Sequence, residues 1–139
     1  MAYCHEGSVD GSVLADRTAT LWRAISAYDV GDDGRISSGA FYSKGGDHIS
    51  MCVSDPTWPA EHQVPWMPEG CGIATVSVGD VLDVGFDRVE WHEIEMNRDG
   101  RSEYLPGHVN VYYGSTPPAL RRQAKDLASR ARSVRSPRP

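Results

Sequence analysis

The sequence contains few cysteines and no long apolar run, and these two absences exclude several kinds of protein. The cysteines are Cys4, Cys52 and Cys71, and an odd number without a CxxC pair indicates no disulfide framework. The spacing of cysteines and histidines does not match a structural zinc site, so we expect no bound metal. No segment approaches about 18 consecutive apolar residues, so we expect no transmembrane helix. The first residues lack the basic and apolar regions of a signal peptide, and free thiols are typical of the cytoplasm, where we expect the protein to reside.

The length and the number of turn-forming residues indicate one domain. A chain of 139 residues can bury a hydrophobic core without disulfides or a metal, and its 14 glycines and 9 prolines indicate many turns. We expect a partly ordered N-terminal arm over residues 1–18 and a single domain over residues 19–134. Residues 135–139 are expected to form a loose C-terminal tail.

Alternating and helical patterns follow one another in an order typical of α+β proteins. Alternation predicts strands over residues 21–25, 48–54, 72–78, 89–96 and 108–113. The sequence from Ser77 to Asp80 resembles a capping box and predicts a short helix over residues 78–84. A second helix is predicted after Pro117-Pro118, because apolar residues recur there at helical spacing. We therefore expect a mostly antiparallel sheet of about five strands, with a short central helix and a C-terminal amphipathic helix.

The segment over residues 55–72 is rich in proline and contains Trp58 and Trp66. Its prolines exclude a regular helix or a central strand. A long ordered loop of this kind is either a cover for the core or a lid over a pocket, and the sequence leaves both interpretations open.

Basic residues are concentrated near the C-terminus. Residues 119–139 have seven basic side chains and one acidic side chain, a net charge of +6, whereas the remaining 118 residues have a net charge of −11. Such a segment can pack onto its own domain or a second subunit, or it can attract an acidic partner such as nucleic acid. The helical spacing of its apolar residues favours packing, with the arginines on the solvent side.

Two short segments place a histidine where polar and apolar residues alternate. These segments are His48-Ile-Ser-Met51 and His108-Val-Asn-Val111. We expect both imidazoles to project from one face of the sheet, with the Ser37-Ser38 loop and an arginine close by. The side chains expected to bind a ligand are Arg23, Arg35, Ser37, Ser38 and Phe41.

The two histidine segments resemble the twin motifs of two-histidine phosphoesterases, in which Ser or Thr follows each histidine two residues later. Ser50 follows His48 at this spacing, whereas Asn110 follows His108. The resemblance implies that one imidazole acts as a general base and the other as a general acid on a phosphodiester.

A second group of residues resembles ADP-ribosyltransferases, which combine an arginine on one strand, serines on the next and a later glutamate. The resemblance implies that Arg23 binds the pyrophosphate of NAD and that Ser37 and Ser38 shape the nicotinamide pocket. Glu93 or Glu95 would supply the catalytic carboxylate. NAD is expected as a cofactor only under this alternative.

The order of several motifs over residues 20–135 also resembles a group of small prokaryotic proteins of unknown function. The motifs are Arg35-x-Ser-Ser-x-Ala-Phe41, Ile49-Ser-Met51 and Gly107-His-Val-Asn-Val111. This resemblance implies a compact α+β domain and no particular activity. We therefore expect a small bacterial or phage domain that binds a small molecule or a protein partner, with the two enzymatic interpretations as alternatives.

Overall fold

The computed structural model describes residues 10–42, 46–54, 70–92, 95–98, 101–104, 107–114 and 116–137. For residues 95–98, 101–104 and 117 it describes the backbone alone. The elements in chain order are β1 (Thr20–Ile25), η1 (Ala27–Asp29), η2 (Ser38–Phe41), β2 (His48–Ser54), β3 (Gly72–Ser77), α1 (Val78–Asp83), β4 (Arg88–Trp91), β5 (Glu95–Arg98), β6 (Arg101–Tyr104), β7 (His108–Tyr112), α2 (Pro117–Arg130) and β8 (Arg132–Arg135).

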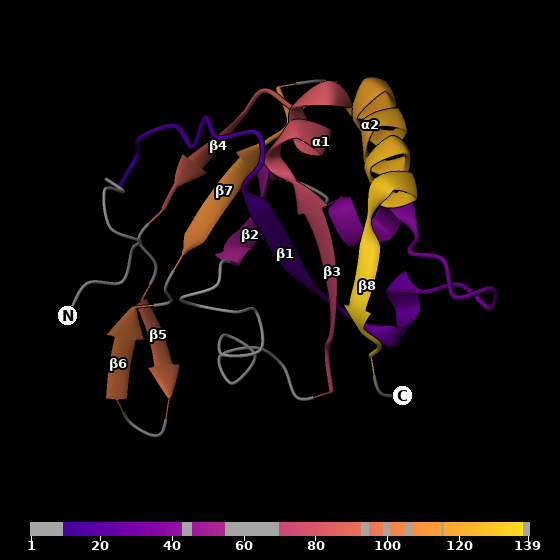
Figure 1. Cartoon of the computed structure of the whole chain (residues 1–139), viewed down its shortest axis with the longest axis horizontal. Coiled ribbons are helices and arrows are strands. Elements are labelled where there is room, and N and C mark those ends of the chain that lie inside the picture. The colour runs from indigo at the N-terminus through magenta and orange to yellow at the C-terminus, as the bar shows by residue number, and fades with distance from the viewer. Residues whose placement is uncertain are drawn as a thin grey trace.

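Six of these strands form one antiparallel sheet in the order β4-β7-β2-β1-β3-β8, while β5 and β6 form a separate two-stranded sheet (Figure 1). The predicted α+β class is confirmed. The strand expected over residues 89–96 is divided into β4 and β5, which belong to different sheets. The main sheet has six strands, whereas about five were expected, because β8 also joins it.

The core lies between one face of the main sheet and the helices α1, α2 and η2. Leu21, Ile49 and Val109 on the strands are no more than 2 % exposed, and they belong to the same cluster as Phe41 of η2 and Leu127 of α2. Burial of this apolar surface supplies the main favourable term in folding. The expected amphipathic helix is confirmed as α2, whose buried residues are Leu120, Ala124, Leu127 and Ala128.

The C-terminal helix ends earlier than its apolar periodicity indicates. Ala131 has an extended backbone with ψ of 150°, and the chain then pairs with β3 as β8. Ser133 lies opposite Ala74, and Arg135 lies opposite Ile73. Pairing with β8 satisfies the backbone N–H and C=O groups along the edge of β3. If α2 continued as a helix instead, these groups would have no strand to pair with.

The capping box that the sequence predicts is present at the start of α1. The Ser77 hydroxyl accepts a hydrogen bond from the amide of Asp80 at 3.0 Å, and the Asp80 carboxylate accepts one from the Ser77 amide at 3.4 Å. Gly85 follows the helix with φ of 108°, a conformation that favours glycine. This helix links β3 to β4 across the top of the sheet (Figure 1).

The two edges of the main sheet differ. Along β4, residues of the N-terminal arm form backbone hydrogen bonds, including Leu14 N to Val89 O at 2.8 Å and Trp91 N to Ser12 O at 2.9 Å. At the other end, within the described ranges, no strand pairs with the outer side of β8. Among the described helices, none is long and apolar enough to cross a membrane.

Candidate functional site

The two histidines of the sequence motifs project from the same face of the sheet, as expected. In the register of β2 and β7, His48 lies opposite Tyr112 and Cys52 lies opposite His108. Opposed residues share a face, so both imidazoles lie on the face away from the core cluster. The histidines are four register positions apart, roughly 13 Å along the strands. They therefore occupy opposite ends of one strand pair.

His108 is buried and neutral. Its ring Nδ1 lies 3.0 Å from the backbone oxygen of His92, and the two imidazole rings are 5.2 Å apart. Burial lowers the pKa of His108 to about 4, although the hydrogen bond to the His92 carbonyl acts in the opposite direction. The Nδ1–H tautomer that donates to this carbonyl leaves Nε2 as an unprotonated base.

His48 has a different environment at the other end of the pair. Its Nδ1 lies 2.7 Å from the carboxylate of Asp47, and its ring centroid lies 5.4 Å from that of Tyr112. The guanidinium of Arg88 stacks on the same Tyr112 ring at 4.1 Å and also pairs with Glu90. Arg88 and His48 thus both contact Tyr112, and the charge of Arg88 is already paired.

Two further buried side chains share this face: Cys52 lies opposite His108, and Asn110 lies between the histidines, opposite Ser50. Burial raises the pKa of the Cys52 thiol to about 12, so this thiol is not an activated nucleophile. The Asn110 side chain is 4 % exposed, and its Oδ1 has no hydrogen-bond partner among the described residues. Within the described residues, no cluster of three metal-ligating side chains is present on this or any other surface.

Arg23 and Phe41, two of the predicted ligand-binding residues, instead contribute to the core face. Phe41 is fully buried. The Arg23 guanidinium donates hydrogen bonds to the Ala40 carbonyl through Nε and to the Ser50 carbonyl at 2.7 Å through NH1. Burial lowers the pKa of Arg23 from its ordinary value, and its bonds tie η2 to β2. The Nε and NH1 groups of Arg23 therefore stabilise the fold through these hydrogen bonds.

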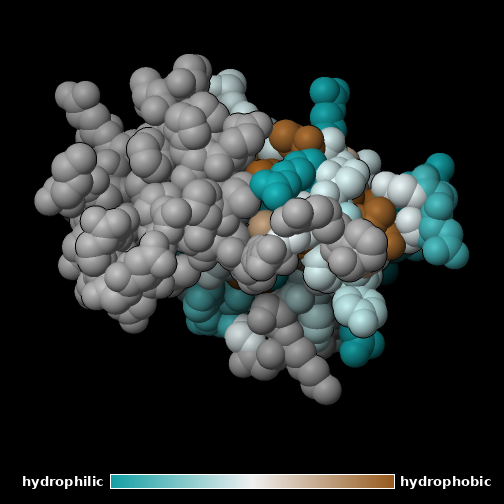
Figure 2. Space-filling model, turned by 90° about the horizontal axis from the view of Figure 1, so that it is seen from below, coloured by the Kyte–Doolittle hydropathy of each residue, from teal (hydrophilic) through white to brown (hydrophobic). Residues whose placement is uncertain are grey.

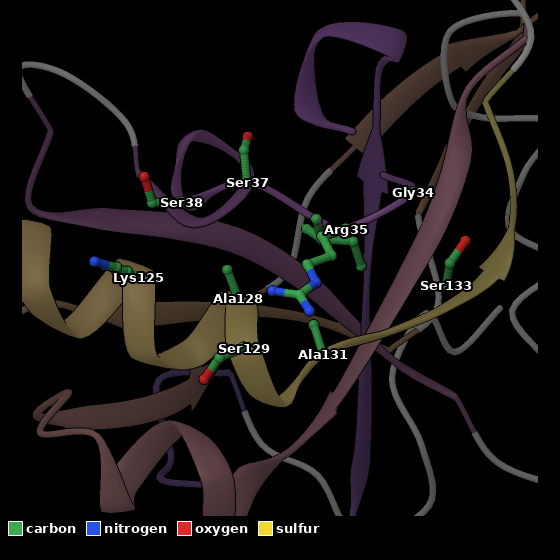
Figure 3. A pocket seen from close by; sticks show the side chains of 10 residues that line it. Gly34, Arg35, Ser37, Ser38, Lys125, Ala128, Ser129, Ala131 and Ser133 are labelled. Atoms are coloured by element: carbon green, nitrogen blue, oxygen red, sulfur yellow. The ribbon is translucent and has the colours of Figure 1, made fainter. Parts of the chain in front are cut away.

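The remaining three predicted residues, Arg35, Ser37 and Ser38, lie together in a groove of about 690 Å³, which we call the Arg35 groove. Residues 34–38 form one wall. The opposite wall comes from α2, Ala131 and β8, and its residues are Lys125, Ala128, Ser129, Ala131 and Ser133. Figure 3 shows Lys125 near one end of the groove, Ser133 near the other and Arg35 between them.

Cations and hydroxyl groups give the Arg35 groove its chemistry. The Arg35 side chain is 87 % exposed and makes one exposed ion pair with Asp33 at 3.6 Å. Such a pair contributes little stability, so a ligand can replace it. None of the described lining residues is acidic. Guanidinium, ammonium and hydroxyl donors together suit a carboxylate or a phosphate.

The structure does not bring the serines and the histidines into one site. Ser37 and Ser38 lie at η2, which packs with α2 against the core face, whereas His48 and His108 are on the other face. The expected proximity of the Ser37-Ser38 loop to both histidines is therefore wrong. Alternation along a strand determines which side chains share a face, but it does not determine which face a distant loop covers.

The positions of the two candidate glutamates leave the ADP-ribosyltransferase interpretation a prediction. Glu93 and the loop over residues 55–69 lie outside the described residues. Glu95 begins β5, for which the backbone alone is described, and β5 is not part of the main sheet. The roles of Trp58 and Trp66 also stay predictions.

Lys125, Ser129 and Ser133 are groove residues that the sequence analysis did not identify. Lys125 and Ser129 are separated by four positions, so they lie on one side of α2. This spacing was a usable signal, but nothing in the sequence indicates that this side of the helix faces residues 34–38.

Comparison with protein-family models, curated proteins and solved structures found no match for this chain.

Proposed function

We propose that this chain is a binding domain that takes an anionic ligand in the Arg35 groove. The observation that carries the proposal is that Arg35 and Lys125, from distant parts of the sequence, meet in a hydroxyl-lined groove whose described lining contains no acidic residue. A volume of about 690 Å³ is within the range of small-molecule sites. The ligand is a carboxylate- or phosphate-bearing small molecule or a segment of a protein partner.

Binding is favoured over catalysis by the state of the candidate catalytic groups. His48 and His108 lie at opposite ends of a strand pair, and the Cys52 thiol is held in its protonated form. General acid–base catalysis on one bond needs both groups within hydrogen-bond reach of the reacting atoms. The Arg35 groove supplies donors for binding and orientation, and the described residues that line it include no imidazole, thiol or carboxylate.

NAD is the second candidate ligand, because Ser37 and Ser38 are shared with the ADP-ribosyltransferase interpretation and Arg35 lies beside them in the groove. A pyrophosphate suits a guanidinium and adjacent hydroxyls. Under this alternative Arg35 takes the role first expected for Arg23, whose Nε and NH1 donate to backbone carbonyls.

We place the protein in a reducing compartment, the cytoplasm. Cys52 and Cys71 are buried and free. Thiols in this state persist where glutathione and thioredoxin keep them reduced.

Thermal unfolding in the presence of candidate anions tests the proposed function. A ligand at 100 times its Kd adds about 2.7 kcal/mol to the free energy of unfolding, which raises the melting midpoint measurably. Inorganic phosphate, NAD, linear and cyclic nucleotides and a short glutamate peptide would be compared. Arg35→Gln and Lys125→Gln should each abolish the shift.

The matched control is Arg88→Gln, which removes the same charge from β4 at the far end of the sheet. Arg88 pairs with Asp87 and Glu90, so the basal midpoint of this variant is measured first. Its ligand-induced shift should equal that of the native chain. If Arg35→Gln, Lys125→Gln and Arg88→Gln all showed the same ligand-induced shift as the native chain, the Arg35 groove would not be the binding site and the proposal would be overturned.

A further inference from the structure

Within the described residues, the outer side of β8 is the open edge of the main sheet. β8 is last in the strand order, and Arg132, Ser133 and Arg135 pair with β3, while a register shift leaves Val134 without a partner residue on β3. Arg132, Ser133 and Val134 are exposed. An edge strand presents backbone N–H and C=O groups to which another extended chain can pair. The opposite edge, β4, already receives backbone hydrogen bonds from residues of the N-terminal arm.

The Arg35 groove lies along this open edge. Ser133 of β8 and residue Ala131 before it line one wall, and Gly34 and Arg35 line the other. In Figure 1 the segment between η1 and η2, which contains Gly34 and Arg35, lies beyond β8 on the side away from β3. A strand added to β8 would therefore run through the groove.

Basic side chains flank this position on both faces of the sheet. Arg132 lies opposite Thr75 and Arg135 lies opposite Ile73, so both arginines share the face that carries Thr75. Arg35 and Lys125 are on the other face, with α2. Successive side chains of an extended peptide point alternately to the two faces. Acidic residues at neighbouring positions of an added strand would thus meet cations on both sides.

The exposed surface offers little apolar area as an alternative means of recognition. The exposed large hydrophobic residues of the described ranges are Val13, Tyr28 and Val134. Seen from the lower end of the molecule, the described hydrophobic residues form small separate areas among polar ones (Figure 2). Of these, Val134 alone is on β8, so recognition there would depend mainly on backbone hydrogen bonds and charge.

We propose that the occupant of the Arg35 groove is an extended acidic peptide segment of a partner protein, which adds to β8 as a further strand. This inference rests on the proposed function and names its ligand class. Backbone pairing would supply affinity, and the four cations would select acidic side chains. The same arginines would repel basic segments and so limit indiscriminate pairing at the edge.

The test uses a capped peptide, Glu-Glu-Val-Glu-Glu, and a second peptide of the same sequence that is N-methylated at every residue. Both peptides have the same charge, but the methylated one has no backbone donors. Binding to the full chain would be measured by fluorescence anisotropy at low salt. We expect the methylated peptide to bind at least tenfold more weakly. Hydrogen exchange at the amides of β8 should slow with the first peptide and not with the second.

Protein variants separate the two charged faces. The double variants Arg35→Gln/Lys125→Gln and Arg132→Gln/Arg135→Gln should each weaken the unmethylated peptide at least tenfold, whereas Arg88→Gln should not. A Lys-Lys-Val-Lys-Lys peptide should not bind. Thermal midpoints of all variants, measured without peptide, identify any that fails to fold. Retained affinity in the Arg132→Gln/Arg135→Gln variant would overturn the proposed role of the second face.

Three results would contradict the strand-addition proposal in distinguishable ways. Equal affinity of both acidic peptides, lost in Arg35→Gln/Lys125→Gln, would leave the anion-binding function in place and remove strand addition. If neither peptide bound but phosphate or a nucleotide shifted the melting midpoint, the anion-binding function would likewise remain and strand addition would be removed. Tighter binding of a short single-stranded oligonucleotide, with the same dependence on Arg35 and Lys125, would replace the peptide by nucleic acid as the partner.

Discussion

The Nδ1 atom of His108 lies 3.0 Å from the backbone carbonyl oxygen of His92, and this contact joins β7 to the end of β4 in a buried setting. The imidazole can donate to this carbonyl while it remains neutral. Protonation would place a second proton, and a positive charge, on a side chain that is 4 % exposed. The stability of the fold should therefore depend on pH.

We predict that the free energy of unfolding falls as the pH drops from about 6.5 to about 4. The folded-state pKa of His108 is lowered to about 4 from an ordinary value of 6.5, so in this window the unfolded chain binds a proton that the folded chain does not. The contribution of His108 to the free energy of unfolding is complete above about pH 6.5. As the pH falls below this value, the contribution declines by up to about 1.4 kcal/mol per pH unit, about 3 kcal/mol in total. Denaturant titrations across this range measure the slope.

The control for the pH prediction is His108→Gln, which keeps a donor for the His92 carbonyl and removes the titrating group. Its stability should change less with pH between about 6.5 and 4 than that of the native chain. Identical slopes for the two proteins would show that other groups dominate the pH dependence.

Leu127→Asp should strongly destabilise the protein. Leu127 is fully buried in the core cluster, so the substitution leaves a cavity and buries an unpaired carboxylate. We expect a loss of at least about 3 kcal/mol, or no folded protein. Asp126→Asn, on the exposed side of the same helix, should change the melting midpoint little. An unchanged midpoint for Leu127→Asp would mean that α2 does not pack on the sheet.

Arg23→Met should destabilise the chain without abolishing ligand binding. The substitution removes the donors to the Ala40 and Ser50 carbonyls while keeping much of the apolar stem. Leaving these acceptors unpaired should cost about 1–3 kcal/mol. Urea unfolding measures the loss, with Arg35→Gln as a control because the Arg35 side chain is 87 % exposed. A neutral Arg23→Met would return this residue to the list of candidate ligand contacts.

Ser77→Ala should lower stability by about 1 kcal/mol through loss of the α1 cap. The Ser77 hydroxyl accepts from the Asp80 amide, and the Asp80 carboxylate accepts in return from the Ser77 amide. Ser77→Asp retains a capping acceptor and should restore most of the loss. If alanine and aspartate gave the same midpoint, the hydrogen bond would be contributing nothing measurable to α1.

Local patterns in the sequence predict much of the fold, because period-two alternation and the capping box are local signals. β1, β2, β3 and β7 lie within one residue of the expected strands at both ends. β8 could not be predicted in this way. Its residues continue the helical periodicity of α2, and their strand conformation depends on pairing with β3, far away in the sequence.

The candidate site could be predicted only in part for a related reason. Arg35, Ser37 and Ser38 were recognisable as neighbouring polar donors, and they share the groove. Lys125 joins them because α2 packs against η2, which is a tertiary relationship. The placement of Arg23 on the core face followed from alternation with Leu21 and Ile25, but its hydrogen bonds to two carbonyls could not be foreseen from the sequence.

The unequal edges of the sheet also limit how copies of this chain could associate through strands. In the described part of the main sheet, β4 is occupied by hydrogen bonds from the N-terminal arm, and β8 is the edge strand with an open side. Two copies that meet through β8 would use the same edge on both sides, so the contact would close as a two-fold dimer. Growth into a fibre needs two complementary open edges on each copy, and the N-terminal arm removes one of them.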